Sequence, residues 1–223
     1  MADNARASSL LGHRDIQVIP NCIDTERFCP GEKAEACQSL GLDPDKKHIL
    51  FAAMSAMKDK NKGYAFLKAA LQQVASDISD QAELVLIGDN YTIEDGFNEM
   101  KVINLGVLRD MVSIVGAYRA ADVTVVPSLS ENLSCTIMES LSCGTPAVAF
   151  DIGGNGDMIR HRSNGYLARE KDPRDLADGI AWCLAQEGDG LSLSARQTVE
   201  NLFTPQIIGA KYAGLYEQLM SRP

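Results

Sequence analysis

Apolar residues occur in short continuous runs, separated by longer segments in which they recur every three or four positions. Nearly continuous runs of this length are typical of strands covered on both faces, and they lie at 48–56, 82–90, 101–108, 122–128 and 145–151. A weaker alternating run at 16–21 predicts a further short strand before a turn. Helical spacing or helix-boundary residues predict helices at 33–40, 65–75, 110–121, 134–143, 173–186 and 204–221. Between the strand at 145–151 and the helix at 173–186, the sequence predicts a short helix, a turn at Asn164-Gly165 and a short apolar segment.

Strands alternate with helices along the chain, which predicts a doubly wound α/β domain with a mainly parallel, Rossmann-like sheet. Such sheets bind their ligands at the carboxyl ends of the strands. The loops after residues 56, 88, 106, 128 and 151 are therefore the places to look for chemistry.

Composition narrows the classes of function. The chain has 223 residues, 45% of them hydrophobic, which suffices for one sizeable core. A net charge of −9 disfavours nonspecific nucleic-acid binding, which requires a basic face. The six cysteines form no C-x-x-C pair and indicate free thiols in a reducing cytoplasm. No apolar run reaches the roughly 18 residues of a membrane span.

Polar residues gather just after the run 122–128, where a turn leads into the helix at 134–143. Ser134 is a good candidate for the N-cap of that helix. The free N–H groups of a helix start, together with the helix dipole, favour an anion. Glu131 lies before this start and Glu139 within the helix, where a carboxylate suits the two hydroxyls of a ribose. On spacing alone, both glutamates are equally well explained as solvated surface residues.

An ordered series of motifs resembles the C-terminal half of family 4 glycosyltransferases of GT-B fold. The series is "VIPNCIDTERFCP", "NKG", "LVLIGDN", "INLGVL", "AADVTVVPS", the Glu131 and Glu139 pair, "CGTPAVAFDIGGNGDMI" and "NGYLA". It runs from about residue 15 to the end of the chain. The variants "ENLSCTIME" and "GGNGDMI" are most similar to bacterial enzymes that build surface polysaccharides or lipopolysaccharide.

The resemblance implies a retaining enzyme that uses a nucleotide-activated sugar. It implies that Glu131 contacts the donor sugar, as the catalytic residue, and that Glu139 contacts the ribose. It further implies that the donor diphosphate is bound by Lys62 and by the helix start at Leu133, Ser134 and Cys135. With Lys62 and the helix start in the place of a cation, we expect neither a metal nor another cofactor.

Three further parts of the site follow from the resemblance. Gly106 and Val107 are expected beside the base, and Gly153 and Gly154 in the loop on the sugar side. The family commonly has an arginine five residues before the lysine, where this chain has Met57. Lys58 or Lys60 is the candidate for the second cation. Asn132-Leu133-Ser134 replaces the usual Gly-Phe-Gly, which leaves the backbone less conformational freedom.

The resemblance also predicts how the chain is divided. Residues 1–14 correspond to a remnant of an interdomain linker, and residues 15–203 to the domain that binds the nucleotide sugar. Residues 204–223 correspond to a helix that reaches toward an N-terminal, acceptor-binding domain absent from this chain. We expect this chain alone to transfer no sugar. We expect the full-length protein to be cytoplasmic, where it can also associate peripherally with a membrane.

Two other functions fit the same motifs. A sugar-nucleotide epimerase of GT-B type would bind the same ligand, but it requires two complete halves and needs no acceptor. A noncatalytic module that binds a nucleotide sugar would require no second half. An assay of the full-length protein with the donor alone separates the epimerase from the transferase.

Overall fold

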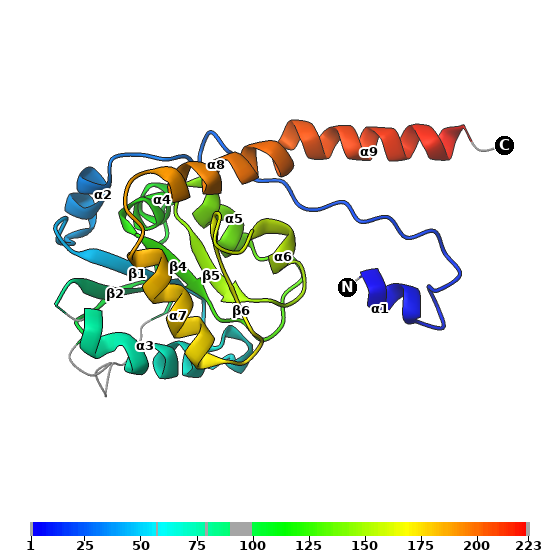
Figure 1. Cartoon of the computed structure of the whole chain (residues 1–223). Helices are drawn as coiled ribbons and strands as arrows, with labels where there is room; N and C mark the ends of the chain where they lie inside the picture. The colour runs from blue at the N-terminus through cyan, green and yellow to red at the C-terminus, as the bar shows by residue number, and fades with distance from the viewer. Residues whose placement is uncertain (1, 57, 79, 90–99, 222–223) are drawn as a thin grey trace.

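A computed structural model describes residues 2–56, 58–78, 80–89 and 100–221 and contains one six-stranded, fully parallel sheet (Figure 1). The strand order is β3-β2-β1-β4-β5-β6. The strands are β1 (Lys47–Ala52), β2 (Ala82–Ile87), β3 (Val102–Gly106), β4 (Val123–Val126), β5 (Ala147–Phe150) and β6 (Gly165–Ala168). The order reverses between β1 and β4, so the carboxyl ends of these two strands flank the point where such sheets bind ligands.

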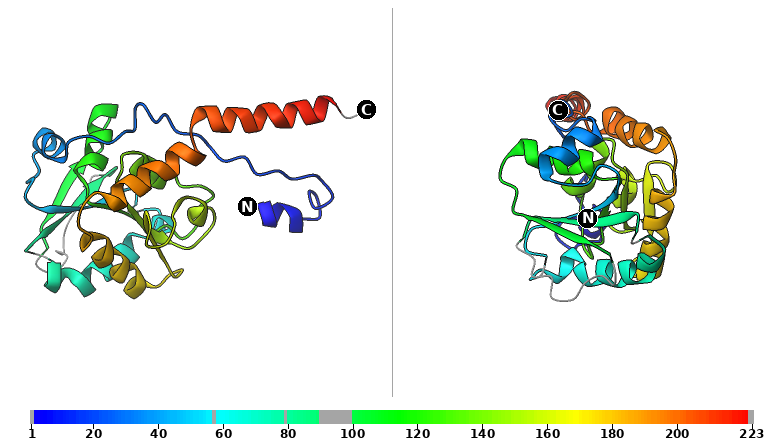
Figure 2. Two further views of the ribbon diagram at one scale, coloured as in Figure 1. Left: turned by 45° about the horizontal axis from the view of Figure 1, so that its top comes forward. Right: turned by 90° about the vertical axis from the view of Figure 1, so that its left-hand side faces the viewer.

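Helices cover both faces of the sheet, because successive strand residues point to opposite sides (Figure 2). Leu50 and Val126 face the first helical layer, while Ile49 and Phe51 face the second. The first layer comprises α2 (Lys33–Leu40), α4 (Met111–Ala120), α5 (Cys135–Ser142), α6 (Asn155–Met158) and α8 (Gly190–Leu202). The second comprises α3 (Tyr64–Ile78) and α7 (Pro173–Leu184).

Two segments extend from the same side of the domain (Figures 1 and 2). One is the N-terminal segment, which carries α1 (Ala2–Ala7), and the other is α9 (Pro205–Met220). Helix α9 begins as predicted, with Pro205 in its first turn and the Thr204 hydroxyl accepting a hydrogen bond from the Ile207 amide. Among the residues that the structure describes, no helix is long and apolar enough to span a bilayer.

The five predicted central strands and the six predicted helices are present, and the mainly parallel sheet is confirmed. The strand predicted at 16–21 is wrong: these residues have no regular structure. The chain leaves this stretch through Ile23, whose amide bonds to the Phe203 carbonyl beside α8 instead of to a strand. An alternating pattern forms a strand only where it pairs with a neighbouring strand, and residues 16–21 belong to no strand of the sheet.

The sequence also fell short in three other places. The short apolar segment after Asn164, for which no strand was predicted, is strand β6, and it pairs with β5 over four residues. Helices α1 and α8 were not predicted, and α8 has many polar residues. The predicted strand 82–90 ends at Ile87, and its last residue lies outside the described residues.

Candidate functional site

Two cavities open at the carboxyl edge of the sheet. The first, here called the apolar cavity, measures about 480 Å³ and lies beyond β1, β2 and β3, against α4 and α5. The second, the acidic cavity, measures about 510 Å³ and lies beyond β4, β5 and β6. Residues that define the apolar cavity include Ala52, Ile87, Val107, Met111, Tyr118 and Glu139. Residues that define the acidic cavity include Ser130, Glu131, Asn132, Asp151, Gly153 and Glu170.

An ion pair between Lys62 and Glu131 joins the two cavities. Lys62 lines the apolar cavity and Glu131 the acidic one, and 3.8 Å separates the lysine Nζ from the carboxylate Oε1. Both side chains stay accessible, at 37% for Lys62 and 16% for Glu131. A partly exposed pair at this distance holds its charges loosely, so an incoming anion can compete for the lysine.

A tight turn fixes Lys62 near the end of β4. Lys62 ends the short 3-10 helix η1 (Lys60–Lys62), whose N-cap, Asp59, accepts a hydrogen bond from the Asn61 amide. Gly63 follows with φ of +70°, and a Cβ there would lie 1.8 Å from the Pro127 carbonyl oxygen. Only glycine allows this approach, so local geometry requires a glycine directly after Lys62.

Glu139 lies on α5 at the wall of the apolar cavity, in contact with α4. The Tyr118 hydroxyl donates a hydrogen bond of 2.6 Å to Glu139 Oε2. Burial raises the pKa of Glu139, and the bond from Tyr118 lowers it in part. Glu139 is therefore not the solvated helix glutamate that its spacing alone allowed.

Gly153 and Gly154 lie directly against the loop that carries Glu131. A Cβ at Gly153, where φ is +54°, would lie 1.9 Å from the Glu131 carbonyl oxygen. A Cβ at Gly154 would lie 2.3 Å from the Asn132 carbonyl oxygen. The glycines thus let the loops after β4 and β5 pack together, and Gly153 also lines the acidic cavity.

The start of α5 lies between the two glutamates. Ser134 occupies the N-cap position as predicted, but its side chain makes no capping hydrogen bond, and it is buried. Leu133 packs against the core, which fixes the approach to the helix. Cys135 is exposed, and burial of its thiol, together with Glu139 and Glu131, raises its pKa. The thiol is therefore protonated, and the backbone amides are the groups that can bind an anion here.

Gly106 and Val107 follow β3 at the mouth of the apolar cavity. Gly106 has φ of +68°, its amide bonds to Asn104 Oδ1 and its carbonyl accepts from the Gly88 amide. Its backbone polar groups are already occupied. Val107 lines the cavity and is 44% exposed, so it is the residue of the two that can meet a ligand.

Lys58 and Lys60 are both exposed and belong to neither set of cavity-lining residues, so within the described part of the chain Lys62 is the lysine at the junction. Met57, the position of the family's arginine, lies outside the described residues.

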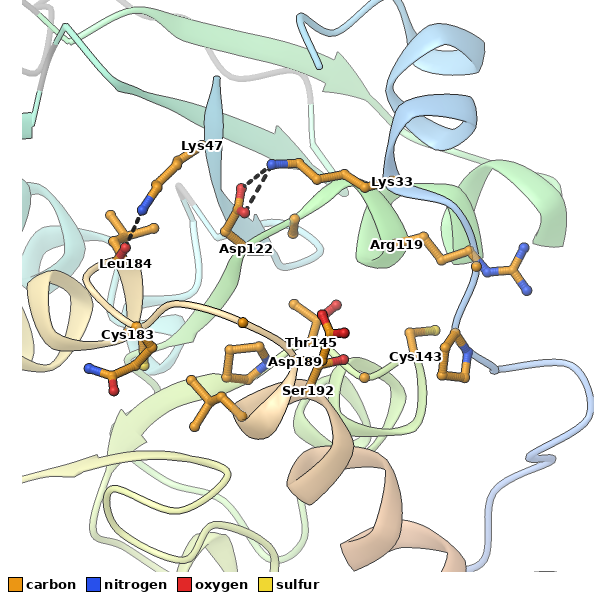
Figure 3. Close-up of a pocket in the computed structure, with 18 residues that line it drawn as sticks. Lys33, Lys47, Arg119, Asp122, Cys143, Thr145, Cys183, Leu184, Asp189 and Ser192 are labelled. Carbon is orange, nitrogen blue, oxygen red and sulfur yellow. Dashed lines mark hydrogen bonds and ion pairs between the residues drawn. The ribbon is translucent and has the colours of Figure 1, made fainter. Parts of the chain in front are cut away.

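A third cavity, of about 420 Å³, lies at the opposite, amino edge of the sheet (Figure 3). Its three basic side chains and Asp122 already have partners inside the protein. Lys33 bonds to Asp122 at 2.7 Å, Lys47 donates to the Leu184 carbonyl, and Arg119 donates to the Cys29 carbonyl. We therefore assign the candidate site to the carboxyl edge.

Sequence reasoning missed Tyr118, because an aromatic residue on an amphipathic helix is usually a core residue. It also missed Asp151 and Glu170, which add two carboxylates to the acidic cavity. Asp151 directly follows a buried strand, and Glu170 comes two residues after β6. A position just after a parallel strand is a signal that would have found both.

The parallel sheet, with its cavities at the carboxyl edge, defines a Rossmann-like domain of the class that binds nucleotide ligands. The chain belongs to the family described as glycosyl transferases group 1, whose model matches residues 46–186. It is 30% identical over 214 residues to a D-inositol 3-phosphate glycosyltransferase of Geodermatophilus obscurus, covering 88% of this chain and 46% of that protein. The chain spans less than half the length of this curated relative.

Solved structures identify the fold as the C-terminal half of a GT-B fold. Sucrose-phosphate synthase from Thermosynechococcus elongatus superposes with a TM-score of 0.81 at 26% identity, covering 98% of this chain and 56% of that one. Anabaena HepE, solved in complex with UDP and glucose, superposes with a TM-score of 0.73 at 23% identity, covering 92% of this chain and 57% of that one.

Proposed function

We propose that this chain is the donor-binding domain of a retaining glycosyltransferase that uses a nucleotide-activated sugar. The observation that carries the proposal is the Lys62–Glu131 pair, at 3.8 Å, at the junction of the two cavities. The nucleoside occupies the apolar cavity, the diphosphate passes Lys62 and the sugar enters the acidic cavity. HepE, which shares the fold, is described in complex with UDP and glucose, so UDP is the first nucleotide to test.

Each side chain has a role that suits its surroundings. Glu139 binds the ribose hydroxyls in the apolar cavity, and Val107 lies beside the base. Lys62 and the amides at the start of α5 neutralise the diphosphate and the departing nucleoside diphosphate, without a metal ion. Glu131 faces the sugar, where positive charge develops as the glycosidic bond breaks.

We propose that an N-terminal domain of the whole protein binds the acceptor. The sequence variants around Glu131 and Gly153 support a surface polysaccharide or lipopolysaccharide acceptor. The curated relatives are named for D-inositol 3-phosphate instead. Assaying the full-length protein with both acceptor classes decides between them. Six free thiols support a reducing, cytoplasmic location.

Calorimetric titration of the chain with UDP, ADP and GDP tests the donor site. We expect one nucleoside diphosphate to bind and the chain alone to transfer no sugar. If none of the three binds, the donor site is wrong.

Kinetics of the full-length protein test the roles. Glu131→Gln is expected to lower kcat, because its contribution grows in the transition state. Glu139→Gln is expected to raise KM, because it binds the ribose in ground and transition states alike. Activity should survive EDTA. A loss of activity that Mg²⁺ or Mn²⁺ restores would show that a metal is needed.

A further inference from the structure

We propose that Tyr118 is a positioning residue for ribose recognition: its hydroxyl holds one oxygen of Glu139, so that the other is presented to the ribose hydroxyls of the bound nucleotide. The inference rests on the proposed donor site. Tyr118 lies on α4 and Glu139 on α5, and both line the apolar cavity. The bond between them, from the hydroxyl to Oε2, is 2.6 Å long.

The direction of this hydrogen bond follows from the surroundings of the two groups. Burial raises the pKa of Tyr118 well above its usual range, and the nearby Glu139 carboxylate raises it further. The phenol therefore stays protonated and donates, and Glu139 accepts. A charge-assisted bond of this kind stabilises the ionised carboxylate, the form that can accept two ribose hydroxyls.

Tyr118 cannot turn away from Glu139, because its surroundings fix both its backbone and its ring. The Thr145 hydroxyl donates a bond of 2.6 Å to the Tyr118 carbonyl. Ser140, on the same helix as Glu139, donates to the Thr145 carbonyl at 2.9 Å. The Phe28 ring packs edge-on against the Tyr118 ring with 6.3 Å between centroids. Tyr118 is only 2% exposed. A rigid donor places the carboxylate at little entropic cost.

Few other charged or titratable groups act on Glu139. Lys62 lines the same cavity from η1, and the thiols of Cys135 and Cys143 lie toward the two ends of α5. Burial raises the pKa of the Cys143 thiol to about 12, and burial also raises that of Cys135, so both remain neutral near pH 7. The groups whose titration can change nucleotide binding are therefore Glu139, Glu131 through its ion pair with Lys62, and the nucleotide's own phosphate, and of these Glu139 is the one bonded to Tyr118.

A purely structural role, in which the bond only braces α4 against α5, makes a different prediction. A brace would affect every ligand of the cavity alike, whereas a positioning residue affects ligands according to their ribose hydroxyls. The chain offers a matched control at a distance from the site. Tyr166 on β6 donates an equivalent bond of 2.8 Å to Asp175 on α7.

The experiment is a titration of wild type, Tyr118→Phe and Tyr166→Phe with UDP and 2′-deoxy-UDP. The same titrations are run with ADP, GDP and their 2′-deoxy forms. For the nucleotide that binds, we expect wild type to prefer the ribose form about tenfold. Tyr118→Phe should weaken the ribose form about tenfold and the 2′-deoxy form less than about threefold, so that the preference collapses. Tyr166→Phe should keep the wild-type preference.

A pH series tests directly whether the ionised form of Glu139 binds the ribose, beside the ribose preference that a brace would not change. Removal of the donor raises the pKa of Glu139, so the loss of UDP affinity on acidification should begin at a higher pH in Tyr118→Phe. If Tyr118→Phe does not fold, 3-fluorotyrosine at position 118 keeps the hydroxyl and makes it a stronger donor. The loss of affinity should then begin at a lower pH than in wild type.

The outcomes separate the inference from the proposed function. Equal weakening of both nucleotide forms by Tyr118→Phe, or an unmoved pH profile with 3-fluorotyrosine, overturns the role of Tyr118 and leaves the donor site intact. Binding of none of the nucleotides by wild type overturns the donor site and the inference with it.

Discussion

The two edges of the sheet carry cavities of similar size, but they differ in how their charges are balanced. At the amino edge, Lys33 and Asp122 form close bonds of 2.7 and 2.9 Å, and the Asp122 carboxylate also accepts from the His48 amide. At the carboxyl edge, the Lys62–Glu131 pair is separated by 3.8 Å, and Glu139 has a short bond to one of its two oxygens.

This difference separates charges used for stability from charges available to a ligand. A short, multiply bonded pair such as Lys33–Asp122 gains little from a new partner. A long, partly exposed pair such as Lys62–Glu131 can exchange its partner for a phosphate or a sugar at small cost. Cavity volume does not distinguish the edges, whereas strand direction and the state of the charges do.

The largest expected effect concerns two glycines, one at each edge. Gly153, beside Glu131, and Gly188, at the amino-edge cavity, both have positive φ, at +54° and +73°. An alanine Cβ would lie 1.9 Å from a carbonyl oxygen at Gly153, but meets nothing within 4 Å at Gly188. We expect Gly153→Ala to lower the free energy of unfolding by about 2–5 kcal/mol and Gly188→Ala by about 1 kcal/mol.

Urea unfolding of the two variants measures this difference. Gly188→Ala serves as the control for backbone strain alone, since the extra loss at Gly153 comes from the clash with the Glu131 loop. Equal losses at the two positions would mean that the loops after β4 and β5 are not packed as the structure shows.

The second prediction compares two carboxylates. Glu139→Gln should weaken binding of the nucleoside diphosphate about 10- to 100-fold, because a hydrogen bond to a charged group contributes roughly 1.5–3 kcal/mol. Asp122→Asn, at the amino edge, should leave binding unchanged and lower stability instead, because Asp122 accepts bonds from Lys33 and His48. Calorimetry measures the nucleotide affinity of both variants, and urea unfolding measures their stability. Wild-type affinity in Glu139→Gln would contradict the ribose role.

The sequence predicted the central sheet well, because buried parallel strands such as 48–52 and 82–87 are nearly continuous apolar runs that local pattern alone reveals. It failed at 16–21, where an alternating pattern is present but the residues pair with no strand of the sheet. It placed Glu131, Glu139 and Lys62 at one edge through motif resemblance, and their predicted roles are still to be tested.

The partners of these residues could not be predicted from the sequence. The bond from Tyr118 to Glu139 joins residues 21 positions apart on different helices, and the Lys62–Glu131 pair joins η1 to the loop after β4. Local periodicity has no access to such contacts, since they depend on how α4, α5 and η1 meet around the sheet.

The smallest expected effect compares two lysines of similar exposure, Lys62 at 37% and Lys33 at 33%. Lys62→Met should weaken nucleoside diphosphate binding about fivefold at low salt, since a partly exposed charge contributes about 1 kcal/mol. The loss should shrink as salt screens the phosphate, because the Debye length falls from about 10 Å at 0.1 M to about 3 Å at 1 M.

Lys33→Met should leave binding unchanged at every salt concentration, because its charge is already paired with Asp122 at the far edge. Titrations of both variants at low and high salt measure the contrast. A salt-independent loss in Lys62→Met would mean that the lysine acts through packing, and an equal loss in Lys33→Met would remove the distinction between the two edges.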